Sequence, residues 1–178
     1  MNGKHITLIF LLALIIRLVY VWGIDAPPVK DAAEYCEYAQ SMIDGKGFQA
    51  RGFKAFRMPL YPVLIASFNA NPKMVRFYQA IIGALSCVLG YLIALKLFGE
   101  RTALICGLMF CFYKAFIVYT SVLLTETLFM FLALFSVLLF LHKHWFCGIA
   151  LGIMLLTRLQ GAGLVLALII AGVHRWQR

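Results

Sequence analysis

The sequence predicts an all-α membrane protein with about five to six transmembrane helices and one long polar outer loop. Hydrophobic residues make up 63% of the 178 residues, and only 13% are charged. A chain with a mean hydropathy of +0.92 could not cover the surface of a soluble domain. Several runs reach the roughly 20 apolar residues that cross a hydrocarbon core. Polar residues instead gather in one passage, residues 31–62, which holds four of the seven acidic residues.

The apolar runs give the order of the predicted spans. They cover residues 5–24, 75–98, 102–120, 122–141, 146–158 and 161–173, and residues 25–74 form the outer loop. The last two runs are either two short, interrupted helices or the halves of one bent span. No small-residue cleavage pattern follows the first run, so we expect a retained signal anchor. Residues 1–178 then form a single transmembrane module.

The first predicted span contains one charged residue, Arg17. It lies near the outer end of the span. We expect its long side chain to snorkel to the interface.

Helical spacing returns inside the polar loop. In residues 31–44, Ala32, Tyr35 and Ala39 share one face at 100° per residue. This pattern predicts a short amphipathic helix that lies along the membrane surface. A second juxtamembrane helix is expected over residues 59–68, because proline is favoured at a helix start.

The distribution of basic residues predicts the orientation. With six spans, one side of the membrane receives Lys4, Lys96, Arg101, Lys143, Arg175 and Arg178. The positive-inside rule makes that side cytoplasmic, with the N-terminus there and the loop outside. We expect an integral protein of a bacterial or archaeal cytoplasmic membrane. Residues 25–76 still hold seven basic and five acidic residues, which favours an anionic partner outside.

Several classes of function lack a signal. No basic run or basic-aromatic stripe exists outside the loop, so nucleic acid is not an expected partner. The five cysteines stand at irregular spacing, and small apolar filler is the simplest interpretation of them. We expect no metal and no cofactor, because no metal-ligand cluster is visible.

Asp31 has two interpretations. It follows a proline pair and precedes Glu34 by three residues, which is typical of a helix N-cap with a capping-box partner. Alternatively, its carboxylate is a general base just outside the membrane that takes a proton from a hydroxyl. The two roles can coexist, because a carboxylate has two oxygens.

Arg57 is the candidate ligand for an anion. With Arg51 and Lys54 nearby, its guanidinium could clamp a phosphate, since the planar fork matches phosphate oxygens. The alternative is a basic stretch that binds lipid headgroups.

Glu126 and Arg158 are charged residues within apolar runs. A lone carboxylate in an apolar run is costly. Glu126 therefore either pairs with Lys114 on an adjacent helix or helps to position the loop or substrate. Arg158 either anchors a helix end or belongs to the same site.

Several motifs together carry a resemblance to a known superfamily. They are Asp31-x-x-x-Tyr35, Gly45-Lys-Gly-Phe48, Arg57-Met-Pro-Leu-Tyr-Pro62, Arg76, residues 97–99, residues 119–128, Gly148-x-x-x-Gly152 and Leu156-Thr-Arg158. In this order they resemble GT-C glycosyltransferases, with the closest likeness to the protein O-mannosyltransferase and aminoarabinose transferase group. The likeness covers nearly the whole chain and corresponds to the N-terminal portion of such proteins.

The resemblance implies transfer of a sugar from a polyprenyl-phosphate carrier to an acceptor on a protein or glycolipid, with inversion. It implies that Asp31 is the base, that Arg57 binds the lipid phosphate, and that Glu126 lies near the cavity. Arg158 would shape the site, and Tyr35 would pack the loop helix. Family members continue for several more helices, so we expect either a truncated or split member, with a second chain as a candidate source of the remainder, or a fragment of a longer protein.

Two other functions stay open at this stage. The chain could be a non-catalytic protein that binds polyprenyl lipid or a partner subunit. It could also be a small multi-span transporter with Glu126 as the coupling residue. The long charged loop argues against the transporter.

Overall fold

The computed structural model describes residues 2–23, 27–50 and 52–176. It contains helices α1 (Asn2–Trp22), α2 (Asp31–Ile43), α3 (Leu60–Ser67), α4 (Pro72–Phe98), α5 (Glu100–Phe112), α6 (Lys114–Ser121), α7 (Glu126–Leu141), α8 (Cys147–Leu155) and α9 (Ala162–Trp176), with a 3-10 turn, η1 (Leu159–Gly161), before α9. A two-stranded antiparallel hairpin, β1 (Gln49–Ala50) and β2 (Phe53–Lys54), lies in the loop between α2 and α3. The all-α class is confirmed.

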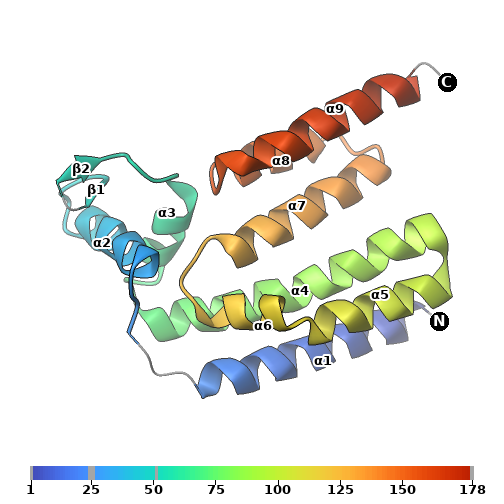
Figure 1. The fold of residues 1–178 in the computed structure, drawn as a ribbon, viewed down its shortest axis with the longest axis horizontal. Helices are drawn as coiled ribbons and strands as arrows, with labels where there is room; N and C mark the ends of the chain where they lie inside the picture. Colours follow the sequence, from blue (N-terminus) through green and yellow to red (C-terminus); the bar gives the residue numbers. More distant parts are fainter. Residues whose placement is uncertain (1, 24–26, 51, 177–178) are drawn as a thin grey trace.

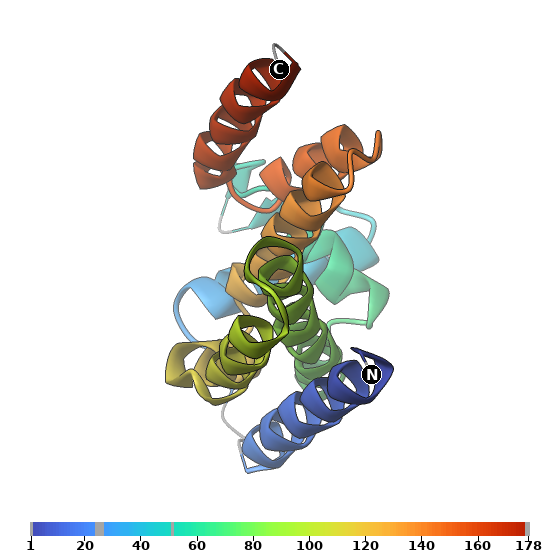
Figure 2. The same ribbon diagram turned by 90° about the vertical axis from the view of Figure 1, so that its right-hand side faces the viewer.

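The long helix α4 is the centre of the bundle. It packs against α1, α5 and α7, and Figure 2, which looks roughly along these helices, shows it between α1 and α7. Small residues on α4 allow the close approach, because their neighbours meet the backbone directly. A Cβ on Gly90, for example, would lie 3.1 Å from the ring of Phe110 on α5.

The loop elements form a separate group at one end of the bundle. Figure 1 shows α2, α3 and the hairpin gathered at this end, while the start of α1 and the end of α9 lie at the other. Tyr35 and Ala39 of α2 are buried against Tyr61 and Ile65 of α3, as the predicted amphipathic face requires. The basic residues Lys4, Lys96, Arg101 and Lys143 belong to helix ends or turns opposite the loop, whereas Arg178 and the side chain of Arg175 lie outside the described residues.

Fewer helices than expected are long enough to cross a membrane. Among the described residues, Gly3–Trp22 and Pro72–Phe98 pass by length and composition, and α5 with α6 would make a third span bent by 45°. We expected five or six. Helix α7 has 16 residues, or about 24 Å at 1.5 Å per residue, against a hydrocarbon core of about 30 Å. The helical structure is interrupted at Tyr113, at residues 122–125 and at residues 156–158. Helices α5 to α8 are therefore shorter than the apolar runs in the sequence.

The open question about residues 146–173 has a clear answer in the structure. They form two helices, α8 and α9, and Figure 1 shows that the chain reverses direction at η1 between them. The break is therefore a turn between antiparallel helices.

Arg17 does not snorkel, and that prediction is wrong. Its side chain is fully buried, and it donates from Nη1 to the carbonyl of Ala13 at 3.1 Å and from Nη2 to that of Phe110 at 3.3 Å. The carbonyl of Phe110 lies in the last turn of α5, where the break at Tyr113 removes a normal helical donor. Arg17 thus satisfies backbone freed by the break, as irregular backbone at membrane depth requires.

Candidate functional site

The first residue of α2 is Asp31, and it does not cap the helix. Lys30 holds the N-cap position with φ of 54°, and no side chain caps the helix there. The capping-box interpretation of Asp31 and Glu34 is therefore wrong. Both carboxylates instead accept hydrogen bonds from Arg57. This residue lies 26 positions after Asp31 and 23 positions after Glu34 in the chain.

Asp31, Glu34, Tyr35 and Arg57 form what we call the acid–guanidinium cluster. Nη2 of Arg57 donates to Oε2 of Glu34 at 2.7 Å and to Oδ1 of Asp31 at 3.0 Å. The guanidinium also lies over the ring of Tyr35, 5.4 Å from its centroid. That is the geometry of a cation–π contact. One cation is thus held between two anions and an aromatic face.

The environment fixes the charge of two members of the cluster. The hydrogen bond to Glu34 is the main cause that raises the pKa of Arg57, so the guanidinium stays charged. Burial raises the pKa of Tyr35, although Arg57 acts in the opposite direction. The Tyr35 phenol therefore stays neutral near pH 7 and cannot serve as a base.

A second ion pair joins α7 to the turn after α8. Nη1 of Arg158 lies 2.7 Å from Oε1 of Glu126, the first residue of α7. The predicted partner, Lys114, is exposed at the start of α6 and forms no ion pair with Glu126 among the described residues. Arg158 is the partner because α8 packs against α7 and returns the chain to the end of the bundle where α7 begins.

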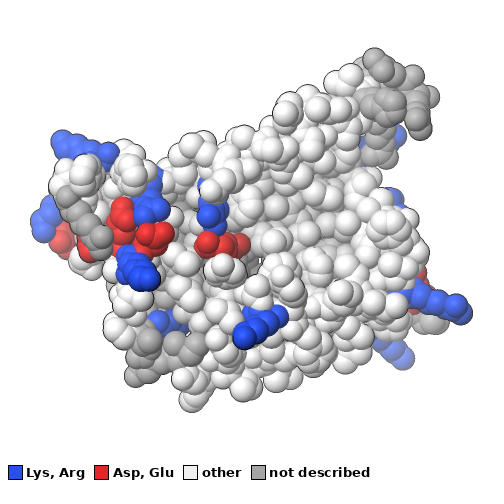
Figure 3. Space-filling view, viewed as in Figure 1, with Lys and Arg blue, Asp and Glu red and all other residues white. Residues whose placement is uncertain are grey.

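The cluster and this ion pair lie near each other at the same end of the bundle. Arg57 and Arg158 lower the pKa of Tyr35 and Glu126 raises it, so all three charges lie near its phenol. The backbone N–H of Leu60 on α3 donates to the carbonyl of Leu156 at 3.2 Å. Figure 3 shows acidic and basic side chains together at this end and further basic side chains at the opposite end, with a largely uncharged surface between them.

Two buried side chains of α4 hold the segment that leads into α7. The amide of Gln79 donates to the carbonyls of Thr120 and Val122, both at 2.9 Å, and accepts a hydrogen bond from the hydroxyl of Tyr61. Nε of Arg76 donates to the carbonyl of Ser121 at 2.9 Å. These contacts fix the irregular stretch that places Glu126. Sequence reasoning missed Gln79, although it is the only amide between residues 75 and 98.

The remaining predicted residues have different positions. Arg76 is buried at 5% exposure and serves the backbone, so its contact with substrate stays a prediction. Lys54 is exposed on β2 and forms no hydrogen bond or ion pair with the cluster among the described residues. Arg51 lies outside the described residues.

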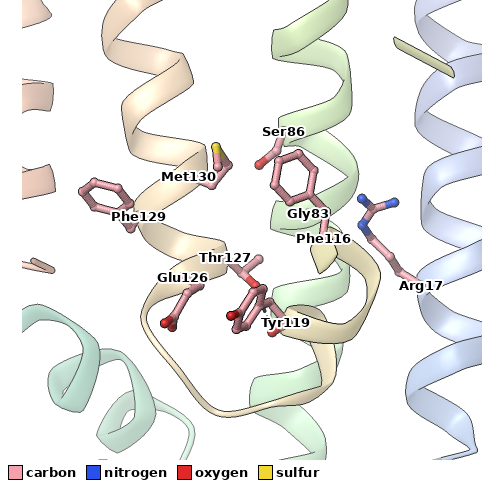
Figure 4. A pocket seen from close by; sticks show the side chains of 9 residues that line it. All are labelled: Arg17, Gly83, Ser86, Phe116, Tyr119, Glu126, Thr127, Phe129 and Met130. Carbon is pink, nitrogen blue, oxygen red and sulfur yellow. Dashed lines mark hydrogen bonds between the residues drawn. The ribbon is translucent and has the colours of Figure 1, made fainter. Parts of the chain in front are cut away.

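A cavity of about 130 Å³ lies beside Glu126, between α1, α4, α6 and α7. Figure 4 shows Arg17 reaching toward it from α1, with Met130 and Phe116 among its apolar lining. Glu126 contributes the acidic part of the wall, and its Oε2 is buried without a hydrogen-bond partner among the described residues.

The part of the chain that the structure describes has no group of three or more His, Cys, Asp or Glu residues able to hold a metal. The expectation that the protein uses no metal or cofactor stays a prediction.

An all-α membrane module with acids and guanidinium groups at one end of its helices fits the class of GT-C glycosyltransferases. Residues 61–178 match the family described as dolichyl-phosphate-mannose-protein mannosyltransferase, and the chain belongs to that family. It is therefore a membrane glycosyltransferase of the mannosyltransferase type. No curated protein and no solved structure matches the chain. The family match includes Arg76, Glu126 and Arg158, and the acid–guanidinium cluster precedes it.

Proposed function

We propose that this protein transfers a sugar from a polyprenyl-phosphate donor to an acceptor hydroxyl at the outer face of the membrane. The observation that carries the proposal is the 3.0 Å contact between the Asp31 carboxylate and the Arg57 guanidinium. An acid and a phosphate-binding group from separate segments of one loop stand together at the end of an apolar bundle.

The proposed reaction needs a base on one side of the anomeric carbon and a stabilised leaving group on the other. Asp31 takes the proton of the acceptor hydroxyl, whose oxygen forms the new bond to the anomeric carbon with inversion. The bond from that carbon to the phosphate oxygen breaks, and the polyprenyl phosphate leaves with its electron pair. Arg57 stabilises the charge that grows on the phosphate, which is the usual largest contribution to such catalysis.

Other residues would shape the site. Arg57, Arg158 and Glu126 all influence the pKa of Tyr35, so a sugar bound at Tyr35 would lie close to both ion pairs. Tyr35 packs edge-to-face on Tyr61 at 5.3 Å, which holds the loop helix in place. Lys54 and Arg76 would add positive charge for the phosphate or nearby headgroups.

The experiment reconstitutes the chain with polyprenyl-phosphate mannose and a peptide or glycolipid acceptor. Wild type is compared with Asp31→Asn and with Glu37→Gln, a matched change of charge at an exposed position on the same helix. We expect Asp31→Asn to lose at least about a hundredfold in turnover, since general-base catalysis contributes 10²–10⁴-fold. Glu37→Gln should retain wild-type turnover.

Two results would contradict the proposal. Full turnover by Asp31→Asn would remove Asp31 from the role of base. Tight binding of the lipid by every variant, with no transfer by wild type, would favour a non-catalytic lipid-binding protein.

A further inference from the structure

The two carboxylates on Arg57 are held unequally. Glu34 is 15% exposed and lies 2.7 Å from Nη2, whereas Asp31 is 62% exposed and lies 3.0 Å from the same nitrogen. Exposed ion pairs contribute little to stability, because solvent screens the two charges. Short charge-assisted hydrogen bonds in partly buried sites are stronger. The contact with Asp31 is therefore the one that an incoming anion can replace at low cost.

Arg57 is held firmly by other contacts. Glu34 fixes one nitrogen, and the rings of Tyr35 and Phe56 lie 5.4 and 5.8 Å from the guanidinium carbon. Its Nε is buried and has no hydrogen-bond partner among the described residues. The guanidinium thus stays in place when the contact with Asp31 is exchanged for a further oxyanion.

Charge sets which groups can share the site. One guanidinium faces two carboxylates, so the cluster is already more negative than neutral. A phosphate that arrives while both carboxylates remain would place three anions around one cation. Like charges at such distances repel strongly, and release of the exposed carboxylate relieves that repulsion.

We propose that Glu34 is the residue that positions Arg57, and that the phosphate of the polyprenyl carrier takes the place of Asp31 on the guanidinium. The proposal rests on the proposed function, because it assumes that Arg57 binds this phosphate. Its consequence is a coupling between the donor and the base. Once displaced, the Asp31 carboxylate no longer contacts Arg57, so its oxygens are free to accept a hydrogen bond from the acceptor hydroxyl when the donor is in place.

The test measures binding without turnover. A polyprenyl monophosphate that lacks a sugar is titrated against the chain in lipid nanodiscs, with inorganic phosphate and the uncharged polyprenol as separate arms. Asp31→Asn should bind the polyprenyl monophosphate about two- to fivefold tighter, which is the fold-change of a competing contact worth about 0.5–1 kcal/mol. Glu34→Gln should bind it at least about threefold more weakly, and Glu37→Gln should equal wild type.

Asp31→Asn and Glu34→Gln each remove one negative charge from α2. Opposite changes in affinity for the polyprenyl monophosphate therefore cannot come from the loss of charge alone, and they decide the question. A shift in the same direction for Asp31→Asn and Glu34→Gln would overturn the exchange. Weaker binding by Asp31→Asn, a largely exposed position that should fold normally, would overturn it as well. Binding of inorganic phosphate with the same pattern would confirm that the phosphate group itself makes the exchange, whereas equal binding of the polyprenol would overturn it.

A kinetic readout separates positioning from a merely structural role. In the transfer assay, Glu34→Gln should raise KM for the donor while Asp31→Asn lowers kcat. Loss of kcat with unchanged KM in Glu34→Gln would contradict a positioning role. Arg57→Gln tests the proposed function independently of the exchange. If this variant binds the polyprenyl monophosphate as tightly as wild type, Arg57 does not bind the phosphate, and that conclusion holds for any behaviour of Asp31 and Glu34.

Discussion

Gly83 lies directly against the side chain of Arg17. A Cβ added at Gly83 would lie 2.8 Å from Nε and 3.1 Å from Cδ of Arg17. The Arg17 side chain cannot move aside freely, because its other nitrogens donate to the carbonyls of Ala13 and Phe110. The buried arginine and the glycine therefore form one structural unit between α1 and α4.

Gly83→Ala should destabilise the fold by about 1–3 kcal/mol, the usual cost of overpacking a well-filled site. The measurement is unfolding of the purified protein in mixed micelles by denaturing detergent. Gly148→Ala is the matched control, since a Cβ there meets no atom within 4 Å. An equal loss of stability in both variants would contradict the contact between Gly83 and Arg17.

At the scale of elements, the breaks between helices are held by side chains from other helices. Gln79 is the clearest case, because a single amide serves the carbonyls of Thr120 and Val122 and the hydroxyl of Tyr61. The same groups would otherwise be buried without partners. Each such group costs about 1–3 kcal/mol.

Gln79→Leu should therefore cost at least about 2 kcal/mol of stability, because it leaves several buried groups unpaired at once. Tyr61→Phe removes one hydrogen bond and should cost about 1 kcal/mol. Both are measured by unfolding in the same micelles. A smaller loss for Gln79→Leu than for Tyr61→Phe would show that water or other side chains satisfy the segment.

The ion pair between Glu126 and Arg158 joins α7 to the turn before α9. Both side chains are about a third exposed, at 28% and 31%, so screening by solvent limits the energy of the pair. A double-mutant cycle of Glu126→Gln and Arg158→Gln should give a coupling of about 0.5–1 kcal/mol. The same cycle with Lys114→Gln in place of Arg158→Gln should give none, and a coupling to Lys114 instead would contradict the structure.

The sequence was sufficient for the class of fold and for the part of the chain that forms the candidate site. Composition and run length predict the apolar helices, and the concentration of charge in residues 31–62 predicts the end of the molecule that carries Asp31 and Arg57. Local patterns do not reveal which distant groups meet. Arg17 reaches Phe110 and Gln79 reaches Thr120 across 93 and 41 positions, so no spacing rule along a helix could find these partners.

The capping error at Asp31 has the same origin. A capping box is a local pattern, and the residues at Asp31 and Glu34 satisfy it by type and spacing. Arg57, which follows the hairpin, donates hydrogen bonds to both carboxylates in the structure, and among the described residues no side chain caps the start of the helix. Long-range charge pairing thus overrides a local preference.

At the scale of the whole molecule, the two ends of the bundle differ in kind. One end holds the site, and the other holds Lys96, Arg101 and the pair of His5 and Glu100 at 3.3 Å. If the positive-inside rule sets the orientation, the site faces outward.

Cysteine labelling tests on which side of the membrane each end of the bundle lies. Lys54 and Lys96 are both exposed, and each is replaced singly by cysteine in a protein whose native cysteines have been removed. A membrane-impermeant maleimide should label Lys54→Cys on intact cells and Lys96→Cys only after permeabilisation. The reverse pattern would place the site in the cytoplasm and exclude transfer at the outer face, and labelling of both before permeabilisation would show that the two ends do not lie on opposite sides.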